Sequence, residues 1–280
     1  MNPWITEKAC AKINLALHVL GKREDGYHEL DSIIAFADFG DELRLREAEK
    51  TSLEISGAFA NNIPSGDDNI ILKAHNLLQQ IVDVKIPKVE ITLQKNLPVA
   101  AGLGGGSADA AALVRAFSRL INIELSAQKI QSLAKSLGAD VPVCYYQTSC
   151  QIQGIGEIIR ALPINLPKAI VLINPLKSCS TQEVFSQLAL KNGQHHLEKV
   201  DVENSPLWRN DLTTPAIAVE PDIKNVLSAL EQEQCFLATR MSGSGATCFG
   251  LIDNMASASA AAARLSVRNP NWWVKAAELL

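Results

Sequence analysis

The sequence predicts an α+β protein with two domains, residues 1–162 and residues 163–280. A chain of 280 residues that is 47% apolar can bury one large core or two small ones. Segments with alternating apolar residues are mixed with segments in which apolar residues recur at helical spacing, which predicts both strands and helices. The proline-containing stretch 162–167 is the best candidate for the domain boundary.

The composition favours small, soluble partners. The net charge is −4 and the basic residues are scattered, so there is no electrostatic footprint for nucleic acid or an anionic membrane. No run approaches about 18 uncharged apolar residues, and the N-terminus lacks a signal-peptide pattern. The six cysteines occur singly, so we expect free thiols, no metal site and a cytoplasmic protein. A monomer or a homodimer is expected.

The N-terminal segment predicts a series of strands. The first covers residues 9–19, and its apolar side chains alternate with a second set that is expected to face solvent. This second set comprises Lys12, Asn14, Ala16 and His18. Asp25-Gly26 predicts a turn into a second strand at 27–36, and short alternating runs at 42–46 and 52–56 predict two more.

The middle of the chain predicts helices that alternate with a strand. The expected elements are a helix at 68–82 with Asp68 as its cap, a strand at 88–94, a helix at 108–120 and a helix at 126–137 with Ser126 as its cap. The glycine-rich stretch 98–107 therefore joins a strand to the N-terminus of a helix.

The C-terminal part predicts a split β-α-β arrangement of the ferredoxin-like kind, with one helix as an insertion. The expected elements are strands at 169–173, 236–241, 247–252 and near Trp273, and helices at 181–190, from Pro221 onward and at 255–265. The residues around 191–207 carry little pattern.

Four glycines within five positions, at 102 and 104–106, are the strongest chemical signal. Such a run lets backbone N–H groups converge on an anion, and the positive end of the following helix adds to the attraction. Proteins bind phosphates in this way, and the hydroxyl of Ser107 can contact a phosphate or its magnesium ion. A purely structural loop is the alternative reading.

Other glycine-loop templates do not fit. The dinucleotide pattern needs a third glycine where Ser107 or Asp109 stands, and a Walker loop needs a Gly-Lys-Ser/Thr that is absent. The protein-kinase signatures are absent as well. A second glycine loop, at 241–247, joins the two strands of the far domain, and a simple hairpin is its alternative reading.

A lysine and an aspartate could together carry phosphoryl transfer to an alcohol, which needs positioning, charge neutralisation and a proton acceptor. Lys12 and Asn14 point to the same side of the first strand, so they can share one ligand. Asp140 stands two residues before a proline, a position that equally suits a helix cap.

Several segments together resemble the GHMP kinases, a superfamily that includes galactokinase, homoserine kinase and mevalonate kinase. These segments are AKINLALHV (11–19), DGYHEL (25–30), PVAAGLGGGSA (98–108), GADVP (138–142) and SGSGAT (242–247). The first and fourth are most similar to the branch of the non-mevalonate isoprenoid pathway that phosphorylates a cytidylyl sugar alcohol. The similarity extends over nearly the whole chain.

The resemblance implies an N-terminal ATP-binding domain, a C-terminal ferredoxin-like domain and an active site between them. It implies ATP-dependent phosphorylation of the 2-hydroxyl of 4-diphosphocytidyl-2-C-methyl-D-erythritol, with Asp140 as the general base and Lys12 assisting. The ATP-binding residues are expected to be Asn69, Lys95, Pro98, Gly102, Leu103, Gly104, Gly105, Gly106, Ser107 and Ala108. Of these, Asn69 and Lys95 fall where the family contacts the adenine. The acceptor-binding residues are expected to be Asn14, Tyr27, His28, Ala139, Thr181, Phe185, Gly243, Ser244 and Gly245. Of these, Asn14 and His28 match residues that hydrogen-bond the cytosine, and Tyr27 and Phe185 match rings that stack on it. ATP would bring Mg²⁺ with it.

One departure from the family pattern lies in the glycine loop. Relatives often carry a second serine where this chain has Ala108, followed by Asp109, whose charge could repel phosphate unless it points away. Another GHMP kinase, for homoserine or mevalonate, and a non-catalytic binding protein of the same fold are the alternatives. Ordinary packing remains the alternative role of Tyr27, His28 and Phe185.

Overall fold

The computed structural model describes residues 3–82, 84–162, 165–195 and 198–280. The chain forms two compact units, each assembled from separate stretches of sequence. Unit 1 comprises the stretch up to Ala11, Phe39–Val99 and Gly104–Gln147, and unit 2 comprises Lys12–Asp38, Ala100–Leu103 and Thr148–Leu280. The expected domain boundary after residue 162 stays a prediction, because Pro163 lies outside the described residues.

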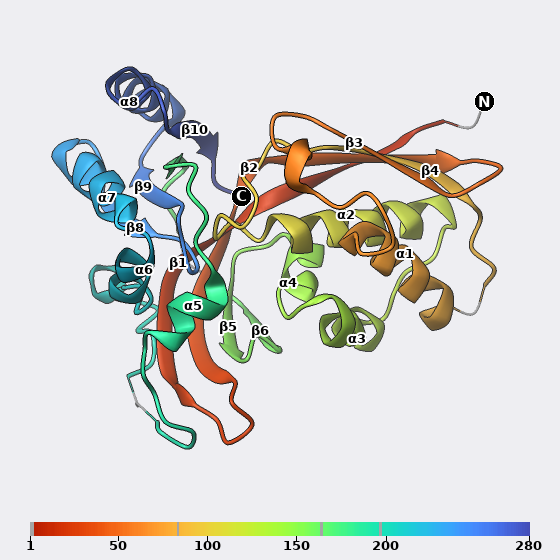
Figure 1. Ribbon diagram of the computed structural model, residues 1–280, viewed down its shortest axis with the longest axis horizontal. Coiled ribbons are helices and arrows are strands. Elements are labelled where there is room, and N and C mark those ends of the chain that lie inside the picture. Colours follow the sequence, from red (N-terminus) through yellow and green to blue (C-terminus); the bar gives the residue numbers. More distant parts are fainter. Residues whose placement is uncertain (1–2, 83, 163–164, 196–197) are drawn as a thin grey trace. The chain divides into compact units, whose positions relative to one another are not determined.

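Two long paired strands, β1 (Ile5–Lys22) and β2 (His28–Glu47), contribute residues to both units (Figure 1). The turn between them includes Gly26 at a φ of 86°, as the Asp25-Gly26 pair predicts. The predicted strands at 27–36 and 42–46 are wrong as separate elements, since β2 runs through both. Gly40 interrupts the pattern because its backbone passes close to β1, where a Cβ atom would stand 2.0 Å from the carbonyl oxygen of Ala9.

The larger sheet has the strand order β3-β4-β2-β5-β6, with β1 paired to β2. The predicted strands β3 (Ser52–Ser56) and β4 (Val89–Gln94) are confirmed, and they pair in parallel. Strands β5 (Cys150–Gly154) and β6 (Ile158–Ala161) were not predicted, and they pair with each other in unit 2. Both strands are short, five and four residues, so the alternation of apolar and polar residues in β5 is too brief to mark a strand.

The helices of unit 1 are α1 (Ile70–Ile81), α2 (Gly105–Leu120), α3 (Ala127–Leu137) and α4 (Val141–Tyr146). Asn69 caps α1 instead of the expected Asp68, and Ser126 caps α3 as predicted. Helix α2 begins within the glycine run, three residues earlier than expected, and it packs against α1 and α4. Nine of its residues are buried, five of them alanines, so it is the central helix of this unit.

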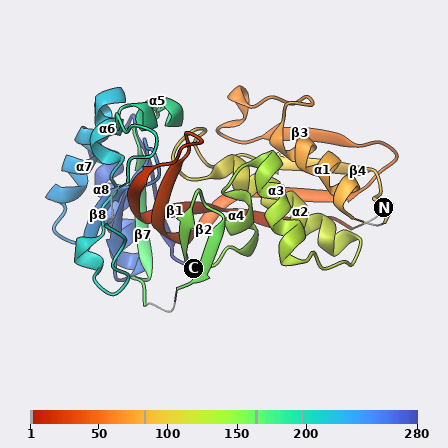
Figure 2. The same ribbon diagram turned by 90° about the horizontal axis from the view of Figure 1, so that it is seen from below.

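Unit 2 contains the antiparallel sheet β10-β7-β9-β8. Its strands are β7 (Ala169–Asn174), β8 (Ala238–Met241), β9 (Cys248–Ile252) and β10 (Trp273–Glu278). Helices lie between β7 and β8 and between β9 and β10, which gives the β-α-β-β-α-β order of a ferredoxin-like fold. The predicted architecture of the C-terminal part is therefore confirmed (Figure 2).

Helices α7 (Asp222–Gln232) and α8 (Met255–Arg268) bury one face of this sheet in an apolar core. Two shorter helices precede them, α5 (Thr181–Ser186) and α6 (Thr213–Val219). The predicted helix at 181–190 is too long, and α6 was not predicted. Helix α6 contains Pro215 and begins with two threonines, which are β-branched and have low helix propensity. Its sequence therefore does not indicate a helix.

Candidate functional site

Hydrogen bonds join the two glycine loops within unit 2. The Oγ of Ser242 donates a hydrogen bond of 2.8 Å to the carbonyl oxygen of Gly102, and Thr247 N donates one of 3.2 Å to Ala101. A Cβ on Gly102 would stand 2.3 Å from the carbonyl oxygen of Ser242, so only glycine permits this approach. The loops at 98–107 and 241–247 thus share one local structure.

Strand β1 brings Lys12 and Asn14 to the same place. The Nζ of Lys12 donates a 3.0 Å hydrogen bond to Oδ1 of Asn14, whose backbone N donates to Oγ of Ser242 at 3.1 Å. The backbone N of Lys12 bonds to the carbonyl oxygen of Leu103 at 2.9 Å, and Nδ2 of Asn14 donates to Ser32 at 2.9 Å. These contacts join β1, β2 and both glycine loops.

The expectation that Lys12, Asn14, Ala16 and His18 face solvent is wrong. Lys12 is only 4% exposed, and the other three are buried as well. Other segments cover this side of β1: Asn14 contacts Ser242 and Ser32, and His18 contacts the carbonyl oxygen of Glu198. Alternation correctly assigned these residues to one side but could not show what covers it.

The glycine run starts helix α2 in unit 1. Gly104 is the N-cap residue and adopts the left-handed conformation, with a φ of 64°. The backbone N of Ala108 bonds to the carbonyl oxygen of Gly104 at 2.8 Å, which leaves the N–H groups of Gly105, Gly106 and Ser107 outside the helical ladder. Three convergent donors at the positive end of a 16-residue helix suit an anion.

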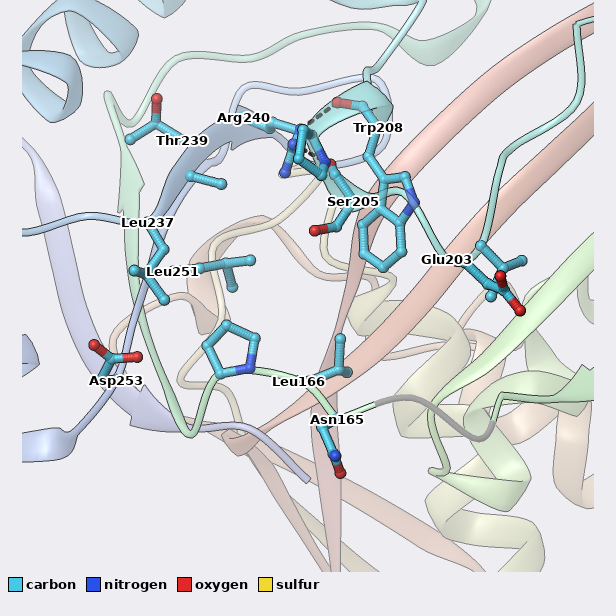
Figure 3. Close-up of a pocket in the computed structure, with 14 residues that line it drawn as sticks. Asn165, Leu166, Glu203, Ser205, Trp208, Leu237, Thr239, Arg240, Leu251 and Asp253 are labelled. Atoms are coloured by element: carbon cyan, nitrogen blue, oxygen red, sulfur yellow. Dashed lines mark hydrogen bonds between the residues drawn. The ribbon is translucent and has the colours of Figure 1, made fainter.

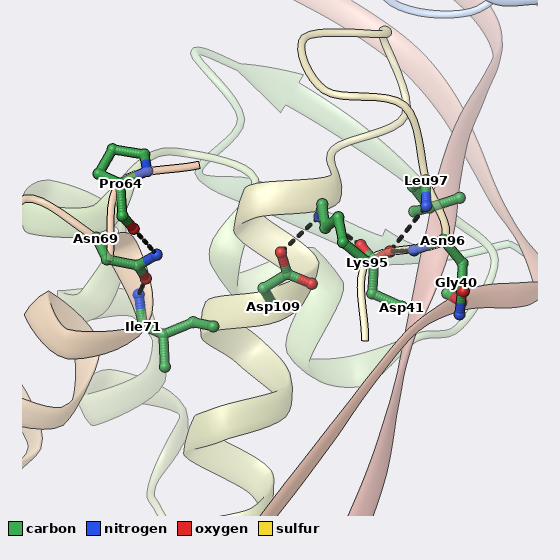
Figure 4. Close-up of polar contacts among 9 residues, drawn as sticks. All are labelled: Gly40, Asp41, Pro64, Asn69, Ile71, Lys95, Asn96, Leu97 and Asp109. Carbon is green, nitrogen blue, oxygen red and sulfur yellow. Dashed lines mark hydrogen bonds and ion pairs between the residues drawn. The ribbon is translucent and has the colours of Figure 1, made fainter. Parts of the chain in front are cut away.

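Three charged side chains meet beside this helix end, and we call Asp41, Lys95 and Asp109 the Lys95 cluster (Figure 4). The Nζ of Lys95 lies 2.6 Å from Oδ2 of Asp109 and also contacts Oδ2 of Asp41. All three residues are buried. Asp109 therefore points to Lys95, and this ion pair offsets the repulsion of phosphate that its charge could cause.

Burial and the two carboxyl groups shift the pKa values within the Lys95 cluster. Desolvation raises the pKa of Asp109 well above its usual range, although the charge of Lys95 opposes the shift. Burial alone would lower the pKa of Lys95, but Asp109 and Asp41 outweigh it and raise that pKa. Lys95 is therefore a fixed cation whose ammonium group is occupied by carboxylates.

Asn69 is the N-cap of α1, and both the oxygen and the nitrogen of its side-chain amide form hydrogen bonds. Its Oδ1 accepts from Ile71 N at 2.8 Å, and its Nδ2 donates to the carbonyl oxygen of Pro64 at 2.6 Å (Figure 4). Helix α1 begins close to the glycine run, since a Cβ on Gly106 would lie 3.9 Å from Ile70. The expected adenine contacts of Asn69 and Lys95 stay predictions.

Asp140 lies in unit 1, immediately before α4. Within the described part of the chain, its side chain makes no capping hydrogen bond to that helix. The helix-cap reading of this aspartate therefore loses its support. Ala139 is exposed beside it, and a Cβ on the neighbouring Gly138 would lie 4.0 Å from Oγ of Ser107, near the start of α2.

Two of the predicted base-reading residues touch each other in unit 2. The rings of His28 and Phe185 have centroids 4.8 Å apart, tilted by 36°. Burial, reinforced by the charge of Lys22, lowers the pKa of His28, so the ring is neutral near neutral pH. Tyr27 is 62% exposed and available to a ligand, whereas Phe185 also packs partly against the core of the unit.

The second glycine loop is fixed by residues from several elements. The hydroxyl groups of Thr181 and Ser244 are 2.7 Å apart, and a Cβ on Gly243 would lie 3.0 Å from the carbonyl oxygen of Gly102. Asn210, which the sequence did not mark, donates to the carbonyl oxygens of Met241 and Gly243, both at 2.8 Å. No local pattern could have marked Asn210, because its partners are 31 and 33 positions away.

A separate cavity of about 700 Å³ lies in unit 2 (Figure 3). None of the predicted site residues lines it. Arg240 on its wall donates to the carbonyl oxygens of Trp208 and Ser205, at 2.6 and 3.1 Å. The guanidinium group therefore fastens the 205–208 segment to the sheet.

Comparison with known proteins matches both parts of the chain to one family. Residues 69–148 match the N-terminal domain of GHMP kinases, and residues 191–270 match the C-terminal domain. The chain is 47% identical to a 4-diphosphocytidyl-2-C-methyl-D-erythritol kinase of Rhizobium etli (strain CIAT 652), over 98% of this chain and 94% of that protein. This chain belongs to the GHMP kinases. A relative with the same name from Paramagnetospirillum magneticum is 45% identical, over 98% of each chain.

Solved structures of GHMP kinases agree with this family. A crystal structure of 4-(cytidine 5'-diphospho)-2C-methyl-D-erythritol kinase superimposes with a TM-score of 0.81 and 29% identity, over 98% of this chain and 99% of the other. Homoserine kinase from Cytophaga hutchinsonii shares the fold, with a TM-score of 0.73 at 16% identity over 99% and 95% of the two chains. The family and the fold class predicted from the sequence are confirmed.

None of the helices in the described residues has the length and apolar character needed to cross a membrane. In residues 3–82, 84–162, 165–195 and 198–280, no three His, Cys, Asp or Glu side chains gather as a metal site would require.

Proposed function

We propose that this chain transfers the γ-phosphoryl group of ATP to the 2-hydroxyl of 4-diphosphocytidyl-2-C-methyl-D-erythritol. The observation that carries the proposal is the 47% identity, over 98% of the chain, to a relative that bears this activity in its name. Two glycine loops, a buried lysine and an aspartate at the start of α4 supply groups that such a transfer needs.

Asp140 is the proposed general base, and Lys12 the residue that orients the acceptor and stabilises charge on the transferred group. The burial of Lys12 supports this role, because an ammonium group in a low-dielectric site acts strongly on a nearby oxyanion. Its hydrogen bond to Asn14 fixes the direction of the amine. Asp140 stands immediately before α4, in the GADVP segment (138–142) whose aspartate matches the proton acceptor of the family.

ATP is proposed to bind with its phosphates at the N-terminus of α2. The open N–H donors of Gly105, Gly106 and Ser107 support this role, and so does the left-handed Gly104 that aims them. Pro98, Gly102, Leu103 and Ala108 complete the loop, and Asn69 and Lys95 remain candidates near the adenine. Mg²⁺ is proposed to arrive bound to the triphosphate, with Ser107 able to offer its hydroxyl oxygen.

The acceptor is proposed to be read through its cytosine ring. A neutral His28 can hydrogen-bond the edge of a neutral base, and its contact with Phe185 makes an aromatic surface on which a ring can stack. Tyr27 is exposed and can add a second ring. Asn14, Ala139, Thr181, Gly243, Ser244 and Gly245 are the further candidates. Cytoplasmic location and a monomer or homodimer stay predictions from the sequence.

The test is ADP release with Mg²⁺ and a panel of acceptors: the cytidylyl sugar alcohol, its uridylyl counterpart, homoserine and mevalonate. We expect turnover with the cytidylyl compound and far less with the others. Equal or greater turnover with homoserine or mevalonate would assign the chain to another branch of the family. ATP and acceptor binding without turnover would indicate a non-catalytic protein.

A further inference from the structure

The Lys95 cluster joins both ends of the ATP loop. On the entry side, Oδ1 of Asp41 accepts from the backbone N of Asn96 at 2.6 Å and of Leu97 at 2.8 Å, the two residues before Pro98 (Figure 4). On the exit side, Asp109 belongs to the early part of α2 and holds Lys95 at 2.6 Å. The two ends of the loop are therefore tied to one ammonium group.

The ammonium group also lies directly against the glycine run. A Cβ on Gly105 would stand 3.1 Å from Nζ of Lys95 and 3.7 Å from Oδ2 of Asp41. Gly105 is the first residue of α2, where an N–H donor is open to a phosphate. The cluster thus sits behind the donors that are proposed to bind ATP.

Fold stability alone does not account for such a cluster. Two carboxyl groups and one ammonium group are buried together, and buried charges recover little more than the free energy that their desolvation costs. Oδ1 of Asp109 is buried and finds no hydrogen-bond partner among the described residues. A costly, partly unsatisfied polar group is typical of sites where function demands a fixed geometry.

We propose that Lys95 is a positioning residue for ATP: held by Asp41 and Asp109, it fixes the two ends of the glycine loop and the first turn of α2. This inference rests on the proposed binding of ATP at that helix end. It gives the lysine a role behind the phosphate donors, distinct from the adenine contact expected from the family. Asp109, the departure in the loop, is its partner.

The decisive variant is Asp109→Leu, which removes the link to α2 and leaves Lys95 and Asp41 as a balanced pair. We expect the Kd for ATP, measured by calorimetry without acceptor, to rise by roughly 10- to 100-fold, because a displaced loop misdirects several donors. The KM for the acceptor should stay within about two-fold. The conservative Asp109→Asn keeps an oxygen for Lys95, so its ATP Kd should stay close to that of the wild type.

Glu233→Gln is the matched control, because it disrupts a buried carboxylate with two arginine partners in unit 2 and should leave ATP affinity unchanged. If Asp109→Leu does not fold, the smaller truncation Asp109→Ala carries the same test with the same expected split between ATP and acceptor. A folded variant that binds ATP within two-fold of the wild type overturns the inference, as does an equal loss of ATP and acceptor. Calorimetry keeps this result separate from the identity of the acceptor, whose failure would show only in turnover.

Discussion

The two residues proposed to carry the reaction differ in their surroundings: Lys12 is buried, whereas Asp140 is partly exposed at the start of α4. Lys12 is a buried cation that donates a hydrogen bond to Asn14, and burying a charged side chain is costly unless its charge is needed. Asp140 stands where an aspartate commonly caps a helix, yet no capping bond is formed within the described chain. The burial of Lys12 favours a chemical role, and the role of the aspartate can be tested directly.

Replacing Asp140 by asparagine should lower kcat by roughly 100-fold or more, the usual loss when a general base is removed. The KM values should change little, since the amide keeps the shape of the carboxylate. Steady-state ADP release over a range of both substrates measures this. If the variant only loses thermal stability while kcat stays within a few-fold, Asp140 is a structural residue.

Gly102 should tolerate no side chain. Its φ is 74° and a Cβ would meet the carbonyl oxygen of Ser242 at 2.3 Å, so Gly102→Ala should separate the two glycine loops. We expect a stability loss of roughly 1–3 kcal/mol together with weaker ATP binding. Gly66→Ala is the control, because a Cβ there meets nothing within 4 Å and its φ lies outside the left-handed range. Equal melting temperatures for the two variants would contradict the prediction.

At the scale of elements, local signals predicted well what local forces determine. Helix α3 was found from its Ser126 cap and its periodicity, and the order of strands and helices in the C-terminal part gave the ferredoxin-like arrangement. The glycine run was correctly set between a strand and a helix. Elements without such signals were missed, notably β5, whose Gln151 and Gln153 donate to the buried Asp31 instead of facing solvent.

The site could be predicted only as a set of segments. The motifs identified the two glycine loops. Their contact through Ser242 could not be predicted, because it joins residues 140 positions apart and neither segment's sequence indicates it. The burial of Lys12 depends on what folds over β1, and the pairing of Lys95 with Asp41 crosses 54 positions. Sequence patterns report the periodicity of a segment and are silent on its long-range partners.

The buried carboxylate of Glu233 connects α7 to α8 and predicts a pH dependence of the stability. Glu233, at the end of α7, lies 2.6 Å from Arg264 and 2.8 Å from Arg268 of α8. The hydrogen bond from Arg264 outweighs the effect of burial and lowers the pKa of Glu233. The ionised carboxylate therefore stabilises the fold fully above its unfolded pKa of about 4.3, and this stabilisation is lost as the pH falls through the folded pKa. Glu233→Gln should therefore lower the Tm at pH 7, and the difference from wild type should shrink below about pH 4. A difference that is constant with pH would contradict the ionic origin.

At the scale of the whole molecule, fold and substrate are specified by different parts of the chain. Homoserine kinase shares the architecture at only 16% identity, so the same two-part scaffold serves acceptors that have no base. The branch is instead suggested by the few residues at the start of β2 and on α5, where His28 meets Phe185. Acceptor choice should therefore change without loss of the fold.

Replacing His28 by alanine tests this separation. A site that hydrogen-bonds one base rejects another because its polar groups are then left unpaired, so the variant should lose discrimination between cytidylyl and uridylyl acceptors. The wild-type protein should gain roughly 2.7 kcal/mol of stability at a cytidylyl acceptor concentration of about 100 times Kd, seen as a rise in Tm, and less with the uridylyl compound at the same concentration. In His28→Ala the two acceptors should raise the Tm almost equally, while the shift caused by ATP stays as in the wild type.

Leu188→Ala is a control, because Leu188 packs partly against the same core as Phe185. If His28→Ala keeps the wild-type preference and merely melts earlier, like the control, the histidine is a packing residue and the base is read elsewhere.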